Sequence, residues 1–153
     1  MCKTLEIATE GNNEIIPIPE LTCNVGDGNP VDLMFNELAY SPLSKYFEHP
    51  LGKQLKEWAR TALRAITDET EKRNPNVKSL DILIGGHAVL QNAIGWAIFD
   101  EVYEASNVDH QMHQNKTVEL IMQVNLKEAS AFKLTLSLPG SNVPVSCEYI
   151  QNS

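Results

Sequence analysis

Cysteine is scarce in this sequence, and long apolar runs are absent. The three cysteines, Cys2, Cys23 and Cys147, are an odd number without the close spacing of zinc ligands, so they indicate neither a disulfide framework nor a zinc site. No segment approaches the roughly 20 consecutive apolar residues that a membrane-spanning helix needs. We therefore expect a protein of a reducing compartment, the cytoplasm, without a membrane partner.

Basic residues are also few, because 12 Lys and Arg stand against 20 Asp and Glu and the net charge is −8. A nucleic-acid or anionic membrane surface needs clustered Lys and Arg, so the acidic balance argues against both partners and leaves room only for a local basic spot. Nucleotide-binding glycine loops and a glycine-flanked serine or cysteine nucleophile are missing. We expect no cofactor and no metal, since His110 and His113 lie in a polar segment without a third ligand nearby.

The length of 153 residues suits a single domain, in which residues 1–30 form an irregular, loop-rich segment. There, Pro17 and Pro19 alternate with apolar residues and exclude a central strand or a helix interior. After this segment, the pattern predicts a short helix over 31–40 and a longer amphipathic helix that ends before Asn74.

Three residues of the helical segments have expected roles. Arg60 lies among the charged residues of the long helix, so we interpret it as a solvated helix residue. Trp58 and Trp96 lie on apolar helix faces, and we expect both in the core.

The second half of the sequence predicts a sheet. An apolar strand over 79–84 is followed by a helix that reaches about Ala105, and a helix–strand–helix order is how parallel sheets with covering helices are built. Alternating apolar residues over 118–126 and 132–138 predict a C-terminal β-hairpin with one buried face. The expected fold class is α/β, a mainly parallel sheet flanked by helices, with a C-terminal β-hairpin.

The most informative stretch lies between that strand and that helix and reads Gly85-Gly86-His87-Ala88-Val89. A glycine pair that leads into a helix presents free backbone N–H groups and the positive end of the helix dipole, so a histidine there is well placed to meet an anion. The alternative is a tight turn that needs glycine for steric reasons, with His87 as an ordinary residue near the helix N-cap.

With the Pro19-Glu20-Leu21 loop and the Leu138-Pro139-Gly140 ending, the stretch Ile82–Ala88 resembles the histidine phosphatase superfamily, which has the phosphoglycerate-mutase-like fold. The resemblance runs from about Ile15 to Gly140 and implies one domain over 1–153 that is shortened at its N-terminus. It implies a small phosphorylated molecule as ligand. It also implies that His87 and Ala88 bind the phosphate, and that His87 acts in catalysis together with Glu20, which would protonate the leaving oxygen.

The family's Arg-His-Gly motif, which holds its nucleophilic histidine, is absent from this sequence. The resemblance therefore implies a phosphatase or mutase relative that is incomplete or inactive unless a missing segment or a partner completes it. The alternative is a non-catalytic binding or scaffolding module that keeps the fold for protein interaction. Without the family's first strand, sheet edges would stay open. A substitute strand at Leu5–Ala8, a homo-oligomer or partner chain, or a longer gene product would cover them.

Overall fold

The computed structural model describes residues 18, 30–73, 79–84, 88–105, 116–123, 131–137 and 144–150. Most of these residues are helical, in α2 (Pro30–Leu38), α3 (Leu43–Glu48), α4 (Gly52–Arg73), α5 (Ala88–Ala105) and α6 (Lys116–Gln123). The strands β1 (Ser79–Ile84), β2 (Ala131–Ser137) and β3 (Pro144–Ile150) form one sheet.

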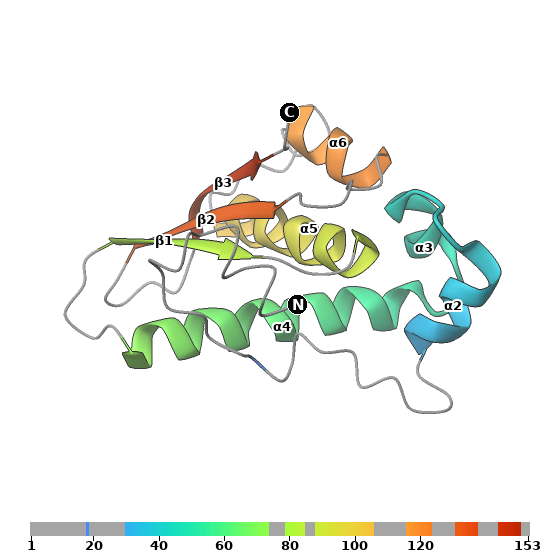
Figure 1. Ribbon diagram of the computed structural model, residues 1–153, viewed down its shortest axis with the longest axis horizontal. Coiled ribbons are helices and arrows are strands. Elements are labelled where there is room, and N and C mark those ends of the chain that lie inside the picture. Colours follow the sequence, from blue (N-terminus) through green and yellow to red (C-terminus); the bar gives the residue numbers. More distant parts are fainter. Residues whose placement is uncertain are drawn as a thin grey trace, which may run out of the picture.

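Helix α5 is at the centre of the fold. It contacts α4, α6 and the strands β2 and β3, and α4 and α6 lie on opposite sides of it (Figure 1). Every side chain from Gln91 to Phe99 is buried, as expected for a core helix surrounded by other elements. This includes Trp96, so the prediction of a core tryptophan is confirmed for that residue, while Trp58 is only partly buried against the core.

Helix α4 is amphipathic, as predicted. Its buried side recurs at three- and four-residue steps and includes Leu55, Ala59, Ala62, Leu63 and Ile66. The small side chains among them let α4 approach α5 closely, and burial of the larger ones stabilises the pair by roughly 25 cal/mol for each Å² of apolar surface removed from water.

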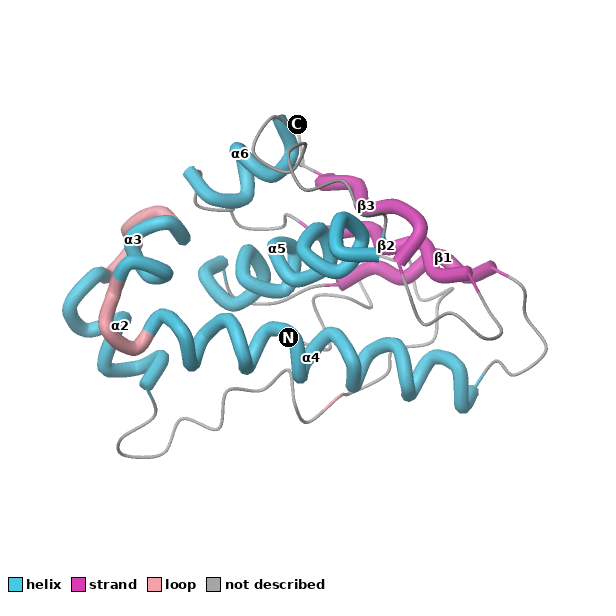
Figure 2. Tube along the Cα trace, turned by 180° about the vertical axis from the view of Figure 1, so that it is seen from behind, coloured by secondary structure: helices cyan, strands magenta, loops and turns pink. Residues whose placement is uncertain are grey.

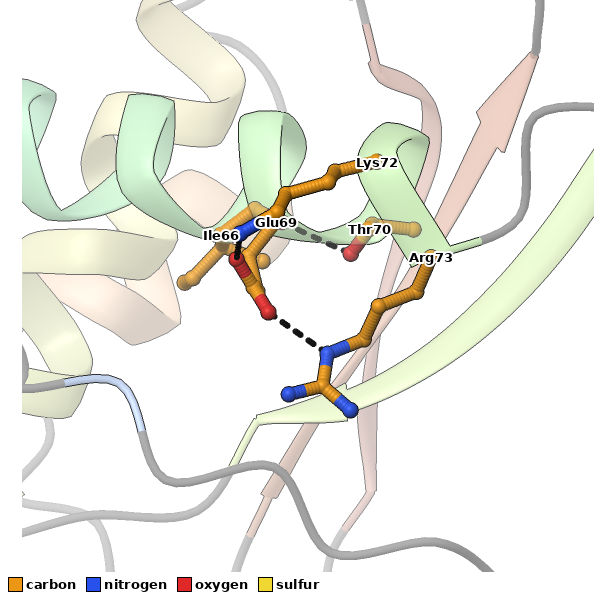
Figure 3. A network of polar contacts seen from close by, with 5 residues as sticks. All are labelled: Ile66, Glu69, Thr70, Lys72 and Arg73. Atoms are coloured by element: carbon orange, nitrogen blue, oxygen red, sulfur yellow. Dashed lines mark hydrogen bonds and ion pairs between the residues drawn. The ribbon is translucent and has the colours of Figure 1, made fainter.

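The last turns of α4 carry a network of polar contacts (Figure 3). Arg73 Nε donates to Glu69 Oε1 at 2.6 Å, Lys72 Nζ lies 3.6 Å from Glu69 Oε2, and the Thr70 hydroxyl donates to the Ile66 carbonyl oxygen at 2.7 Å. Lys72 and Arg73 also lie where cations interact favourably with the negative end of the helix dipole. These contacts stabilise the C-terminal end of a long helix against fraying.

The short helices α2 and α3 pack at the N-terminal end of α4 (Figure 2). Met34, Leu43 and Tyr46 are buried there. At the start of α4 the backbone of Gly52 lies close to the end of α3. A methyl group on Gly52 would lie 2.5 Å from the Phe47 carbonyl oxygen, so this position requires glycine.

The predicted α/β class with a mainly parallel sheet is wrong. Both pairings, β1 with β2 and β2 with β3, are antiparallel, and helices dominate the described residues. The short connection between Ser137 and Pro144 permits only an antiparallel neighbour, since a parallel one needs a crossover of a dozen or more residues. The chain also passes through two helices, α5 and α6, before β2 returns alongside β1 in the opposite direction.

The predicted C-terminal hairpin is wrong in one of its two strands. Residues 132–138 correspond to β2, but residues 116–123 form helix α6, and the hairpin partner of β2 is β3. The strand predicted over 79–84 and the helix predicted to reach Ala105 match β1 and α5. The short helix predicted over 31–40 matches α2 closely.

Candidate functional site

The residues predicted to form a phosphate site are mostly beyond the described part of the chain. Glu20 and His87 lie outside the described residues, as do His110 and His113. Ala88 is the first residue of α5, which agrees with the predicted strand-to-helix junction. The catalytic roles of Glu20 and His87 therefore stay predictions.

Buried amide side chains secure the start of α5. Gln91 Nε2 donates to the carbonyl oxygen of Ile84, the last residue of β1, at 2.9 Å, and Asn92 Nδ2 donates to the Ile121 carbonyl oxygen at 2.8 Å. Both amides are buried, and buried polar groups need such partners. These bonds tie α5 to β1 and to α6, which is a structural role.

A cluster of cations and aromatic rings joins α3, α4 and α5. We call Phe47, Lys56, Arg60, Trp96 and Asp100 the cation–aromatic cluster. The Phe47 and Trp96 rings meet edge to face with centroids 4.9 Å apart. Lys56 Nζ lies 4.7 Å from the Phe47 centroid and 5.6 Å from that of Trp96, and Arg60 Cζ lies 5.2 Å from the Trp96 centroid. These are distances at which a cation is attracted to the face of a ring.

Arg60 is bound rather than freely solvated, so its predicted role as a solvated helix residue is wrong. Its Nε and Nη2 atoms donate to Asp100 Oδ2 at 3.1 and 2.5 Å. The side chain of Asp100 is only 16% exposed, which weakens solvent screening and strengthens a charge-assisted bond. The signal in the sequence was the four-residue spacing of Trp96 and Asp100, which places both on one face of α5.

Lys56 and Arg60 belong to a row of basic residues on one face of α4. Lys53, Lys56, Arg60 and Arg64 follow one another at three- and four-residue steps, and we call them the basic stripe. Lys53 and Arg64 are exposed, whereas Lys56 and Arg60 are partly buried. The stripe lies beside the buried positions of the same helix, and Arg60 reaches Asp100 and Trp96 on α5 from it.

Two members of the basic stripe are matched with carboxylates, and two are not. Arg60 pairs with Asp100, and Lys53 Nζ lies 3.9 Å from Glu57 Oε1. No ion pair joins Lys56 or Arg64 to a carboxylate within the part of the chain that the structure describes.

Helix α2 and its C-terminal turn expose large apolar side chains. Leu33, Phe35 and Tyr40 are 48%, 41% and 74% exposed, and we call them the α2 apolar surface. The Phe35 and Tyr40 rings meet edge to face with centroids 5.5 Å apart. Leu33 and Phe35 flank Met34, the residue that α2 buries, so burial of one side of this helix leaves both flanks apolar.

The turn after α2 is held in place by specific contacts. Ala39 has a φ of 48°, in the left-handed region that non-glycine residues rarely adopt, and this conformation brings Tyr40 back against Phe35. The Tyr46 hydroxyl donates to the Ala39 carbonyl oxygen, and burial raises the pKa of Tyr46 above its ordinary value. These contacts therefore hold the exposed Phe35 and Tyr40 rings in a defined position.

His49 also connects α2 to the start of α4. The Leu51 N–H donates to His49 Nδ1 at 3.1 Å, so the opposite ring nitrogen, Nε2, carries the hydrogen that points to Glu37 Oε2 at 3.0 Å. This fixes the ring between α2 and the start of α4. The described residues contain no group of three or more His, Cys, Asp and Glu side chains that could hold a metal ion.

Comparisons with known proteins assign this chain to no family. No protein-family model matches the chain, and no curated protein and no solved structure matches it. Among the described helices, none is both long enough and apolar enough to cross a membrane. The function therefore has to be argued from the surfaces described above.

Proposed function

We propose that this chain is a non-catalytic scaffolding module that associates with copies of itself through the α2 apolar surface. The observation that carries the proposal is the exposure of Leu33, Phe35 and Tyr40 within one short stretch of chain. Single exposed apolar residues are ordinary, but grouped ones mark interaction sites. Aromatic side chains are also among the residues that contribute most to binding energy in protein interfaces.

The rigidity of this surface supports an interaction role. The edge-to-face contact between Phe35 and Tyr40, the turn at Ala39 and the hydrogen bond from Tyr46 hold the two rings before any partner arrives. Binding by rings that are already ordered costs less conformational entropy than binding by mobile side chains.

The charges around the α2 apolar surface favour a second copy as the partner. Glu37 faces His49, and the exposed pair Lys45 and Glu48 lies on the neighbouring helix α3. A surface that carries both signs can meet itself about a twofold axis, because each acidic group can face a basic group of the other copy.

A phosphatase activity is the alternative to this function, and an enzyme assay distinguishes the two. It needs Glu20 and His87, and the sequence has no Arg-His-Gly motif to supply the family's nucleophile. The antiparallel sheet also differs from the mainly parallel sheet that the resemblance implied. Hydrolysis of p-nitrophenyl phosphate that disappears in His87→Ala would favour the phosphatase and contradict a non-catalytic module.

Sedimentation velocity between about 1 and 200 µM protein tests self-association. We expect the 17.0 kDa chain to form a defined oligomer as its concentration rises. In the double variant Phe35→Gln/Tyr40→Gln the dissociation constant should increase at least about fivefold, because two apolar anchors are lost. The control Gln54→Ala, at an exposed site on α4, should associate like the wild type.

Two results would contradict self-association through this surface. One is a wild-type protein that remains monomeric over the whole concentration range. The other is a double variant that associates as strongly as the wild type while circular dichroism shows that both are folded. A cytoplasmic location is part of the same proposal, and fractionation of cells that express the tagged chain tests it.

A further inference from the structure

The ring of His49 is bonded at both of its nitrogens, and the two bonds lead to different helices. Nε2 donates to Glu37 Oε2 on α2 at 3.0 Å, and Nδ1 accepts from the Leu51 N–H at 3.1 Å, directly before the first residue of α4. The side chain of His49 is only 13% exposed. One ring therefore connects α2 to the beginning of a helix of 22 residues.

The two bonds respond differently to the charge of the ring. A backbone N–H can be accepted only by a ring nitrogen with a free lone pair, so the Leu51 bond requires the neutral form of His49. The Glu37 carboxylate attracts the protonated ring and accepts a charge-assisted hydrogen bond from it. Histidine is the side chain that changes charge between about pH 5 and 8, so uptake of one proton removes the Leu51 bond and leaves the Glu37 bond.

The other ionisable side chains beside His49, on α3 and at the start of α4, have partners of their own. They form two exposed ion pairs, at 2.9 and 3.9 Å, and one hydrogen bond to a carbonyl oxygen: Lys45 with Glu48, Lys53 with Glu57, and Tyr46 with Ala39. Within the part of the chain that the structure describes, Glu37 is the charged side chain that bonds to the ring. The charge of His49 therefore acts mainly between Glu37 and the start of α4.

The helix dipoles move a protonated ring in the same direction. The first N–H groups of α4 form the positive end of its dipole, and a cation beside them is unfavourable. His49 also follows the carboxyl end of α3, the negative end of a shorter helix. A positive charge on the ring is therefore repelled from α4 and attracted towards α2 and α3.

We propose that His49 is a pH-sensitive connection between α2 and α4. In its neutral form the ring binds both elements. When a proton from the solvent binds the Nδ1 lone pair, the Leu51 N–H loses its acceptor, the ring stays with Glu37, and the start of α4 separates from it. The connection acts on the helix that carries the α2 apolar surface, but it does not depend on self-association and should operate equally in a monomer.

Nuclear magnetic resonance of the ¹⁵N-labelled protein tests the proposal. At about pH 8 the ring resonances of His49 should show one hydrogen, on Nε2, and the Leu51 amide should be protected from hydrogen exchange. At about pH 5.5 the ring should carry a hydrogen on each nitrogen. The protection factor of Leu51, which is corrected for the intrinsic exchange rate at each pH, should then be at least about fivefold lower.

Two variants assign the response to the His49 ring. In His49→Asn the asparagine oxygen can still accept from the N–H two residues later but does not titrate, so Leu51 should have the same protection factor at both pH values. This variant keeps the other histidines, His87, His110 and His113, and so controls for their protonation. Glu37→Gln, at an exposed position, should keep the Leu51 response, which excludes protonation of Glu37 as its cause.

Three results would overturn the proposal. The first is a neutral ring that carries its hydrogen on Nδ1, and the second is a wild-type Leu51 amide with equal protection at both pH values. The third is an equal change in His49→Asn, which would assign the response to another group. Self-association at neutral pH is measured separately, so failure of the His49 connection is distinguishable from failure of the scaffolding function.

Discussion

Arg60 and Asp100 lock the two long helices together through a single carboxylate oxygen. The Nε and Nη2 atoms of Arg60 on α4 both donate to Asp100 Oδ2 on α5, at 3.1 and 2.5 Å. The guanidinium also rests against the Trp96 ring, one turn earlier on α5. The bond is therefore placed beside the buried core, where it is better protected from water than a surface ion pair.

Replacing Asp100 tests how much the ion pair with Arg60 contributes to stability. Asp100→Asn keeps the size of the side chain but removes its charge, and we expect the free energy of unfolding to fall by about 1 to 2 kcal/mol. Glu48→Gln breaks the exposed pair with Lys45 and should cost less than about 0.5 kcal/mol. Urea denaturation of both variants gives the comparison, and equal losses would show that the Arg60 bond has no special protection.

Substitution of Gly52 should destabilise the protein although it raises helix propensity. Gly52→Ala would improve an isolated helix by about 1 kcal/mol. Here the added methyl group would lie 2.5 Å from the Phe47 carbonyl oxygen and 2.6 Å from that of Tyr46, so we expect a net loss of about 1 to 3 kcal/mol. Thermal unfolding with Gln54→Ala as the control measures it, and a stabilised Gly52→Ala variant would contradict the close approach.

Glycine at position 39 should have the opposite effect. Ala39 adopts a φ of 48°, which costs a side-chain-bearing residue about 1 to 2 kcal/mol. Ala39→Gly relieves this strain, and we expect a gain of about 0.5 to 1 kcal/mol after the larger chain entropy of glycine is subtracted. Ala65→Gly, inside α4, should instead lose about 1 kcal/mol. Urea denaturation gives the free energy of unfolding of both variants. A gain for Ala39→Gly together with a loss for Ala65→Gly is the result expected if position 39, unlike position 65, is in the left-handed conformation.

The Glu69 network predicts a loss of stability in acid. The hydrogen bond from Arg73 lowers the pKa of Glu69 below its ordinary value; burial partly opposes it by raising the pKa, and the charges of Lys72 and Arg73 lower it further. The folded state therefore favours the ionised carboxylate. This stabilising contribution is fully present above the ordinary glutamate pKa of about 4.3 and is lost as the pH falls through the lower pKa of the folded state.

A variant pair isolates that contribution. Glu69→Gln should be less stable than the wild type at neutral pH, and the difference should shrink once the pH falls below the pKa of the folded state. The carboxyl resonance of Glu69, followed by NMR, should titrate below the ordinary range in the wild type and move back towards it in Arg73→Met, where the main donor is lost. A titration that is unchanged in Arg73→Met would contradict the assigned cause.

The sequence predicts the elements with strong, local patterns and misses what depends on partners far away in the chain. Helix α4 follows from its three- and four-residue apolar spacing, and α5 follows from its long apolar run after a glycine pair. Helix α6 was mistaken for a strand because Val118 and Met122 also fit a two-residue repeat. The buried pair Val118 and Ile121 has the helical spacing instead.

The candidate surfaces were harder to predict than the elements. Asp100 and Arg60 lie 40 positions apart, so nothing in the local pattern of α4 separates Arg60 from a solvated residue. The direction of strand pairing is likewise set by the connection between the strands and not by the amino-acid sequence of β1 or β2. The exposure of Phe35 and Tyr40 depends on which side of α2 meets α3 and α4, and that is decided only by packing.

The pairing of β1 with β2 also sets an order of events at the ribosome. Ile84 meets Phe132, and Ser79 meets Ser137, so β1 is synthesised well before its only described neighbour exists. At about 5 to 20 residues per second, the delay is roughly 2 to 10 s. During that interval the nascent chain carries an unsatisfied apolar strand beside a helical pair that can already dock, which is when chaperones have their opportunity to bind it.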